Sequence, residues 1–300
     1  DESKPLDNII SIDNTDYYFT YLNGNGKNKG GNSIILKLYE SQNIDIEDIE
    51  YEDPDLILKI LRFKKNNNAL LIGKSEKRFL KEIEALKVCN DSNFQNVIKI
   101  YHNGVCKIFD AYKEMYFEYY FYTMEYAEYD LKEFIEHYHS DFTIEAKVSL
   151  CISLAKGVRE LYSKGYYHRD IKPDNIFMVG DMWKIGDLGL LADRKDKSSI
   201  DYSGEFIGPR GWISPEAMNK YLCEDKGFKF SYDCEIDHQS DIFQLGKVFW
   251  YIFQHNAPVG TVKMNDFRIN NGMIFPILKT MLNHSKIKRY RKISQVIDLL

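Results

Sequence analysis

One loop, at residues 168–175, constrains this chain more than any other feature. It follows a helical pattern that stops at Gly165, and it precedes two short apolar segments with the pattern of a hairpin. Asp170 and Asn175 lie within the loop, and Asp187 comes just after the hairpin. The sequence therefore predicts three oxygen ligands or proton acceptors at one edge of a helix-and-hairpin unit.

Such a set of oxygen atoms suits phosphoryl transfer. Mg²⁺ binds one or two carboxylates together with the phosphates of a substrate, rather than a cage made of protein ligands alone. Transfer also needs an acid that orients the attacking hydroxyl while the metal neutralises the developing charge. A single Asp in a loop usually forms a turn or caps a helix. The order and spacing of the whole set therefore carry the prediction.

The loop resembles the catalytic loop of eukaryotic-type protein kinases. Residues 168–175 match the family pattern His-Arg-Asp-x-Lys-Pro-x-Asn. Residues 187–189 resemble the family's metal-binding triplet, with Leu188 where Phe is commoner. Since Leu188 is also apolar, the resemblance still implies metal binding. The resemblance covers nearly the whole chain, from about residue 17 to residue 300.

The resemblance implies a role for each polar residue of this set. Asp170 would be the catalytic base, and Lys172 would stabilise the transferring phosphoryl group. Asn175 and Asp187 would hold Mg²⁺. Lys172 also resembles serine/threonine kinases rather than tyrosine kinases. The implied activity is transfer of the γ-phosphoryl group of ATP to serine or threonine hydroxyls of protein substrates, with ATP and Mg²⁺ as cofactors.

The chain changes its pattern near residue 126. Strand-like runs precede this point at 17–22, 33–38, 56–61, 97–101, 105–109 and 119–126. One helical pattern, at 75–88, lies among them. Helical patterns dominate afterwards, as at 131–138 and 148–162, with an irregular stretch between 185 and 240.

We therefore expect an α+β, bilobal, protein-kinase-like fold. Its N-lobe would be β-rich with one long helix, and its C-lobe would be mostly helical. The expected parts are a tail at 1–16, the N-lobe at 17–126 and the C-lobe at 127–300, which contains an activation segment at 187–216.

Two basic and two acidic residues compete for the expected ion pair of the N-lobe. Lys59 resembles the family lysine that contacts the α and β phosphates, and Glu82 resembles its partner on the long helix. We reject the rival Lys37 because it lies only six residues after Gly31, which leaves no room for the intervening strand and turn. Glu84 also flanks the apolar stripe of the helix, so only the resemblance favours Glu82.

Other positions resemble the family's nucleotide-binding residues. Glu125 and Ala127 match the hinge whose backbone faces adenine, and Met124 before them matches the gatekeeper. Asp130 matches the residue that contacts the ribose.

The glycine-rich segment at 24–31 has one or two residues more than the family pattern. Gly24, Gly26 and Gly30 either cover the phosphates with their backbone N–H groups or form the tip of a hairpin that needs positive φ.

Several C-lobe residues resemble structural positions of the family. Ser214-Pro215-Glu216 resembles the end of the activation segment, and Glu216 should pair with Arg289 or Arg291. Asp241 should hold the backbone of the catalytic loop. Pro209 stands where serine/threonine kinases usually have a threonine, which leaves a dual-specificity kinase as an alternative.

Arg169 resembles the arginine of kinases whose activation segment is ordered by a phosphate. The hydroxyls that could carry this phosphate are Ser198, Ser199, Tyr202 and Ser203. Each of them also fits an ordinary exposed loop residue. Phosphorylation of one of them is therefore a hypothesis.

The charge and the composition argue against nucleic-acid binding and against a membrane-spanning helix. A formal net charge of −5 is unlike that of nucleic-acid-binding domains. No run approaches the roughly 20 apolar residues that a spanning helix needs. Five scattered cysteines without a C-x-x-C pair fit a reducing, cytoplasmic location.

Two inserts, at 40–55 and 217–239, are candidate docking sites for a regulatory partner. The first carries eight acidic residues and no basic one. The alternatives to an active protein kinase are a pseudokinase scaffold or binding module and a small-molecule kinase of related fold.

Overall fold

The computed structural model describes residues 9–22, 32–66, 72–110, 112–138, 142–196, 200–227, 231–269 and 272–300, apart from the side chains of 109 and 110. The chain divides into two compact units. The first comprises Asp1–Asn90 and Lys99–Tyr126, and the second comprises Asp91–Ile98 and Ala127–Leu300.

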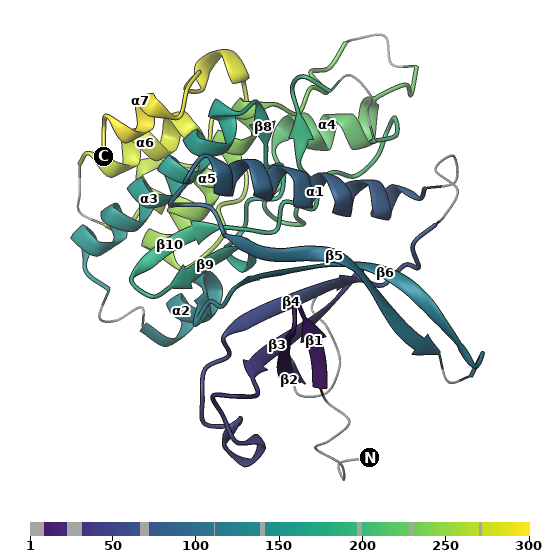
Figure 1. Ribbon diagram of the computed structural model, residues 1–300. Helices are drawn as coiled ribbons and strands as arrows, with labels where there is room; N and C mark the ends of the chain where they lie inside the picture. Colours follow the sequence, from purple (N-terminus) through teal and green to yellow (C-terminus); the bar gives the residue numbers. More distant parts are fainter. Residues whose placement is uncertain are drawn as a thin grey trace. The chain divides into compact units, whose positions relative to one another are not determined.

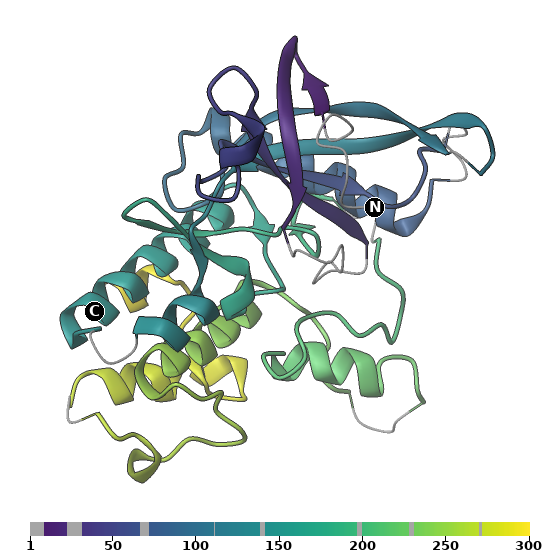
Figure 2. The same cartoon turned by 90° about the horizontal axis from the view of Figure 1, so that it is seen from below.

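The first unit is built on an antiparallel sheet of six strands in the order β1-β2-β3-β4-β6-β5 (Figures 1 and 2). The strands are β1 (Ile9–Ile12), β2 (Thr15–Tyr21), β3 (Ser33–Glu40), β4 (Leu56–Leu61), β5 (Ile100–Asp110) and β6 (Met115–Glu125). Leu36 and Leu38 lie two residues apart on β3, and Leu58 of β4 is paired with Leu36, so these three side chains pack into one cluster on a face of the sheet. The register places Lys59 of β4 between Ile35 and Tyr122.

Two strands differ from the sequence prediction. Strand β1 lies in the segment 1–16 that we expected to be a tail, and it pairs with β2 through Ile9–Ile12. Strand β5 is continuous where two strands were expected, because the turn-like residues Asn103 and Gly104 pair with Tyr122 and Phe121 of β6. The register shift of the β5–β6 ladder lies just before them, between Ile100 and Asn103. Val97 lies outside β5 and forms a parallel bridge with Ile185 instead.

Helix α1 (Lys74–Asp91) is the one long helix predicted before residue 126, and it extends past both predicted ends. Its buried residues include Phe79, Glu82, Ile83 and Leu86. These residues recur every three or four positions, so they share one face. Glu82 is thus carried on the buried side of the helix.

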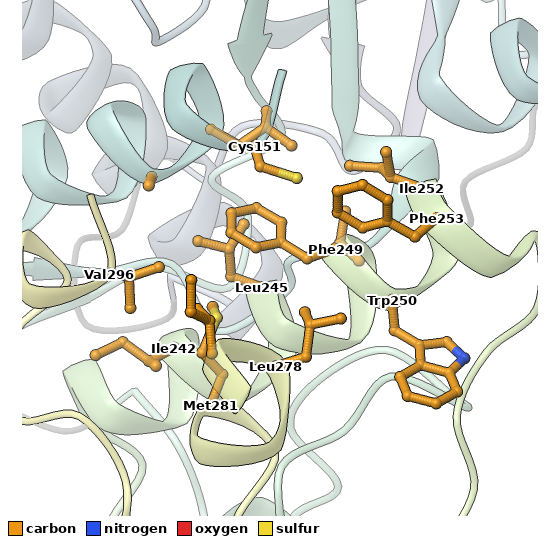
Figure 3. Close-up of a cluster of buried hydrophobic side chains, with 14 of the residues drawn as sticks. Cys151, Ile242, Leu245, Phe249, Trp250, Ile252, Phe253, Leu278, Met281 and Val296 are labelled. Atoms are coloured by element: carbon orange, nitrogen blue, oxygen red, sulfur yellow. The ribbon is translucent and has the colours of Figure 1, made fainter. Parts of the chain in front are cut away.

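The second unit is mostly helical. Its helices are α2 (Leu131–Tyr138), α3 (Ile144–Ser163), α4 (Pro215–Cys223), α5 (His238–Gln254), α6 (Ile274–Met281) and α7 (Ser294–Ile297). Figure 3 shows part of its core, where Leu245 and Phe249 of α5 pack with Cys151 of α3 and with Leu278 of α6. Helix α5 is buried over most of its surface, so it is the central element of this unit.

Short strands surround the catalytic loop. They are β7 (Tyr129–Asp130), β8 (Tyr166–Tyr167), β9 (Ile176–Val179), β10 (Met182–Ile185) and β11 (Ala192–Asp193). Strands β9 and β10 form the predicted hairpin, and β11 pairs with β8. Gly165 has φ +90°, a conformation that glycine adopts without strain, so it ends α3 and turns the chain into β8. The loop at 168–175 is therefore held between α3, β8 and β9.

The predicted α+β class, a β-rich unit with one long helix and a mostly helical unit, is confirmed. Within the part of the chain that the structure describes, none of the helices combines the length and the apolar character needed to cross a bilayer.

Candidate active site

The first unit contains a buried ion pair between β4 and α1. Lys59 Nζ lies 2.9 Å from Glu82 Oε1 and 3.2 Å from Oε2. Lys59 is 9% exposed and Glu82 only 1%. Burying either charge alone would be costly, so each side chain stabilises the charged form of the other.

Tyr122 of β6 completes this pair. Its hydroxyl donates to Glu82 Oε1 at 3.0 Å, and Lys59 Nζ lies 5.5 Å from the centre of its ring. The rivals are placed differently, because Lys37 is half-buried on β3 and Glu84 is exposed on α1. The structure thus pairs Lys59 with Glu82, as the resemblance implied.

The catalytic loop of the second unit is fixed through its backbone. The two oxygens of Asp241 accept the N–H groups of His168 and Arg169, each at 2.8 Å. Gln244, one turn later on α5, accepts the N–H of Ile171 and donates to the carbonyl of Arg169, both at 3.0 Å. The predicted structural role of Asp241 is confirmed, and Gln244 extends it.

His168 is a neutral support within the loop. Its Nδ1 accepts the N–H of Asp170 at 3.2 Å, and its Nε2 lies 3.0 Å from the carbonyl of Gly186. A ring that accepts at Nδ1 and donates at Nε2 is the neutral form. Complete burial lowers the pKa of His168, which favours the same form.

Asp170 lies among groups that control its protonation. Asn175 Nδ2 donates to Asp170 Oδ2 at 2.8 Å, and Lys172 Nζ lies 3.5 Å from the same oxygen. Burial raises the pKa of Asp170 to about 6, Lys172 opposes this change, and the negative charge of Asp187 adds to it. A carboxylate with this pKa is ionised at neutral pH and still accepts a proton readily, which suits a general base.

Asn175 and Asp187 have the chemistry of Mg²⁺ ligands. The Asn175 amide nitrogen donates to both the carbonyl and the carboxylate of Asp170, so its side-chain oxygen is the atom left for a cation. Asp187 is exposed and has φ 54°, an uncommon conformation outside glycine that often marks functional sites. The described residues contain no group of three His, Cys, Asp or Glu side chains that could hold a metal. A carboxylate and an amide oxygen are ligands that suit Mg²⁺ when the ion also binds substrate phosphates.

The structure describes some of the expected nucleotide-binding residues and not others. The N–H of Glu125 donates to the Lys99 carbonyl at 3.1 Å, while its side chain accepts the Lys99 N–H at 2.8 Å. Asp130 Oδ1 accepts the N–H of Glu133 at 2.8 Å, so it caps α2. Its role at the ribose stays a prediction, as does that of Ala127. Gly24, Gly26 and Gly30 lie outside the described residues.

Arg169 contacts the activation segment through its side chain. Its guanidinium binds both carboxylate oxygens of Asp201, at 2.5 and 3.3 Å. Of the four hydroxyl residues considered for phosphorylation, Ser198 and Ser199 lie outside the described part, and Tyr202 and Ser203 directly follow Asp201.

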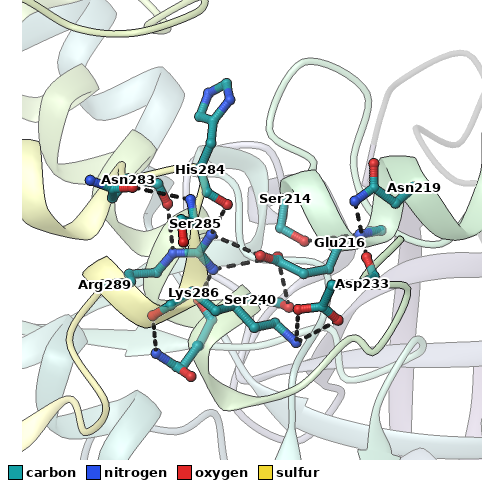
Figure 4. Close-up of polar contacts among 12 residues, drawn as sticks. Ser214, Glu216, Asn219, Asp233, Ser240, Asn283, His284, Ser285, Lys286 and Arg289 are labelled. Carbon is teal, nitrogen blue, oxygen red and sulfur yellow. Dashed lines mark hydrogen bonds and ion pairs between the residues drawn. The ribbon is translucent and has the colours of Figure 1, made fainter. Parts of the chain in front are cut away.

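The end of the activation segment is held by a buried ion pair. Arg289 Nη2 lies 2.8 Å from Glu216 Oε1, and Ser240 Oγ donates to the other oxygen of Glu216 (Figure 4). Ser214, two residues before Glu216, caps α4 by accepting the N–H of Ala217. Of the two arginines that the sequence left open, the partner is Arg289.

The catalytic loop held from α5, together with a lysine–glutamate pair on a sheet and a helix, has the organisation of protein kinases. A family model described as protein kinase domain matches residues 57–300. The chain therefore belongs to the protein kinase family, as its catalytic loop predicted.

Several proteins that are similar to this chain in sequence are named as protein kinases. Serine/threonine-protein kinase KSP1 of Saccharomyces cerevisiae is 34% identical over 131 residues, which are 41% of this chain and 12% of the yeast protein. Mitogen-activated protein kinase kinase kinase 7 of Homo sapiens is 24% identical over 266 residues, 80% of this chain and 38% of the human protein. Dual specificity protein kinase TTK of Mus musculus is 22% identical over 202 residues, 67% of this chain and 23% of the mouse protein. The chain thus spans well under half the length of these relatives.

Three residues of the candidate site were missed from the sequence. Tyr122 is one of many aromatic residues around β6, and only the strand register shows that it meets Glu82. Gln244 lies three residues after Asp241 on the same helix, which is a usable signal. Asp201 was missed because only hydroxyl residues were considered as partners of Arg169.

Proposed function

We propose that this chain is an active, Mg²⁺-dependent protein kinase that transfers the γ-phosphoryl group of ATP to serine and threonine hydroxyls of proteins. The observation that carries this proposal is the environment of Asp170. Its carboxylate is buried beside Lys172 and Asn175, and its pKa of about 6 keeps it charged at neutral pH. Such a group orients an acceptor hydroxyl and takes its proton.

Each of the other residues has a role of positioning or of charge. Lys59, held by Glu82, would bind the α and β phosphates. Lys172 would face the transferring group and lower the energy of its developing charge. Because this chemistry depends on alignment and electrostatics, the buried ion pair and the fixed backbone of the loop both support transfer.

Asn175 and Asp187 would hold Mg²⁺. Mg²⁺ held there would supply positive charge that offsets the charge of the phosphates. The chain's own contribution is to orient these two ligands, Asn175 through Asp170 and Asp187 through the turn that follows β10.

Serine and threonine are proposed as acceptors because Lys172 lies beside Asp170, and because one of the similar proteins described above is named a serine/threonine-protein kinase. Pro209 is buried in the segment that follows Ile207 and lacks the usual hydroxyl. The similarity to a dual specificity kinase keeps tyrosine transfer as the second candidate.

A regulatory partner is proposed for the insert at 40–55. Its carboxylates Asp45, Glu47, Asp48, Glu50, Glu52, Asp53 and Asp55 are all exposed, so a basic partner would fit it. The insert at 217–239 is the alternative. There, Lys286 binds the side chains of Asp233 and Asp237, and part of this insert is therefore anchored to the second unit.

Incubation of the wild-type chain with radiolabelled ATP, Mg²⁺ and a generic basic protein tests this proposal. We expect label in the acceptor, and acid hydrolysis should release phosphoserine and phosphothreonine. Label in phosphotyrosine as well would favour dual specificity. A chain that binds ATP but transfers no phosphate under any Mg²⁺ or Mn²⁺ condition would instead be a pseudokinase.

A further inference from the structure

Arg169 is fixed at both its backbone and its side chain. Its N–H donates to Asp241 and its carbonyl accepts from Gln244. Its φ is 66°, in the left-handed region that costs energy for a residue with a Cβ atom. The surroundings thus hold Arg169 in a conformation that it would rarely adopt alone, next to Asp170.

The Arg169 side chain joins two other segments. Nε donates to the carbonyl of Leu190 at 2.6 Å, three residues after Asp187. The two Nη atoms bind the two oxygens of Asp201. The side chains of Arg169 and Asp201 are only 7% and 10% exposed, so this is a largely buried bidentate pair.

Asp201 therefore makes the pair with Arg169 that the hypothesis of a phosphorylated segment gives to a phosphate. Phosphate and carboxylate both accept two parallel hydrogen bonds from a guanidinium. The resemblance raised the hypothesis that a phosphorylated hydroxyl at 198, 199, 202 or 203 pairs with Arg169. In the structure an unmodified side chain of the chain itself makes this pair.

The residues after Asp201 are tied to acidic groups. Ser203 Oγ donates to Asp225, and the N–H of Gly204 donates to Glu224 Oε2 at 2.9 Å. A phosphate on Ser203 would face both carboxylates and would be repelled by them. The observed arrangement thus needs Ser203 to be unmodified.

We propose that Asp201 is a positioning residue for phosphoryl transfer, which orders the activation segment on Arg169 without phosphorylation. Asp201 holds the Arg169 side chain, and this side chain also holds the turn after Asp187. Loss of the carboxylate should loosen this turn and the segment around residue 201, and it should lower kcat more than it changes nucleotide binding. The inference rests on the proposed kinase activity.

The test compares phosphatase-treated proteins whose lack of phosphate is verified by mass spectrometry. Asp201→Asn removes the charge and keeps the shape, Asp201→Glu keeps the charge, and Asp196→Asn removes one exposed charge from the same segment outside the Arg169 contacts. We expect Asp201→Asn to lower kcat about tenfold, a typical size for coupling between sites. The KM for ATP should stay within about twofold. Asp201→Glu should recover most of kcat, and Asp196→Asn should match wild type.

Hydrogen exchange of the same proteins gives a readout that does not need activity. Asp201→Asn should raise exchange in peptides covering 187–191 and 200–208, and it should leave α3 and α5 unchanged. A double variant with Arg169→Ala should lose no more kcat than Arg169→Ala alone, because both changes break one pair.

Two results would overturn the inference. One is a kcat and an exchange pattern of Asp201→Asn equal to those of wild type. The other is phosphate-free wild type that is inactive while the phosphorylated protein is active. Absence of transfer by wild type in both forms would reject the proposed function instead, and the exchange data would then decide on their own whether Asp201 orders the segment.

Discussion

Lys59 has two roles in this account. It forms a buried ion pair with Glu82, and it is the proposed ligand of the ATP phosphates. Its ammonium group is almost completely removed from water, and Glu82 and Tyr122 surround it. A methionine would fill similar space without charge, but it would leave the buried Glu82 without its charged partner, so the phosphate contact and some stability are lost together.

We therefore expect Lys59→Met to lower kcat/KM for transfer by about 10²-fold or more, as for the loss of an important electrostatic contact. Lys37→Met is the matched control, since Lys37 is a half-buried lysine on the neighbouring strand. It should change kcat/KM by less than about twofold. If the two effects were reversed, the assignment of the phosphate-binding lysine would be wrong.

At the scale of residues, the sequence predicted the site residues that lie close together in the chain. It did not predict the pairs that form between distant parts of the chain. The loop at 168–175 and Asp187 are close in the chain, so their spacing indicated a common site. The choice between Glu82 and Glu84 and between Arg289 and Arg291 depends on how separate elements pack. Single-sequence periodicity could not make these choices, and Asp201 shows that a partner can be of an unexpected chemical type.

At the scale of elements, the beginning of α5 supports the second unit through a buried histidine. His238 Nε2 accepts the N–H of Ile293 at 3.2 Å, and its ring stacks on Tyr162 of α3 with centres 3.8 Å apart. Burial lowers the pKa of His238 to about 4, and Asp237 opposes this change. The ring is therefore neutral in the folded chain throughout the range where an unfolded histidine becomes charged.

This difference predicts how stability depends on pH. Below about pH 6.5 the unfolded chain takes up a proton at His238 while the folded chain does not, so the free energy of unfolding falls as the pH is lowered towards 4. Near pH 4, His238 lowers the free energy of unfolding by about 3 kcal/mol relative to neutral pH. His238→Gln should remove this part of the pH dependence, whereas exposed His137→Gln should keep it.

Urea unfolding between pH 4.5 and 7.5 measures this effect. Tryptophan fluorescence is a suitable probe, because Trp183, Trp212 and Trp250 all lie in the second unit. Parallel pH curves for wild type and His238→Gln would show that His238 does not contribute.

The elements predicted best were those with strong local signals. The hairpin at 176–185 has a Gly-Asp turn, and α3 ends at a glycine. Strand β1 was missed because four residues carry little periodicity, and its pairing with β2 stabilises it. An Asn-Gly pair usually marks a turn, whereas here Asn103 and Gly104 both pair with β6, so β5 is one strand where the sequence predicts two.

At the scale of the whole molecule, the family model covers the two units to different extents. It covers the second unit completely and only part of the first. The matched residues begin at 57, so β4 and all later elements are covered by the family model. Strands β1, β2 and β3 and the acidic insert at 40–55 lie before this point. The sequence predicted a β-rich part with one long helix and a mostly helical part, and the two units have these compositions.

Binding of Mg²⁺ and ATP should stabilise the whole chain by mass action. At a ligand concentration 100 times its Kd, the gain is about 2.7 kcal/mol. We expect a higher Tm with MgATP than without it, and EDTA should remove the Mg²⁺-dependent part. Asp187→Asn should also lose that part, while Lys37→Met should retain it. A shift in Tm that is the same with and without EDTA would contradict the metal role of Asp187.

The most direct test of the central claim is the rate of phosphoryl transfer by Asp170→Ala. The control is Asp174→Ala, which removes the other carboxylate of the same loop. The account predicts that Asp170→Ala lowers the rate by about 10²- to 10⁴-fold, as expected for loss of a general base. The Kd for MgATP should stay close to that of wild type, and Asp174→Ala should transfer normally. Transfer by Asp170→Ala within a few-fold of wild type would contradict the assignment of this residue and of the site built around it.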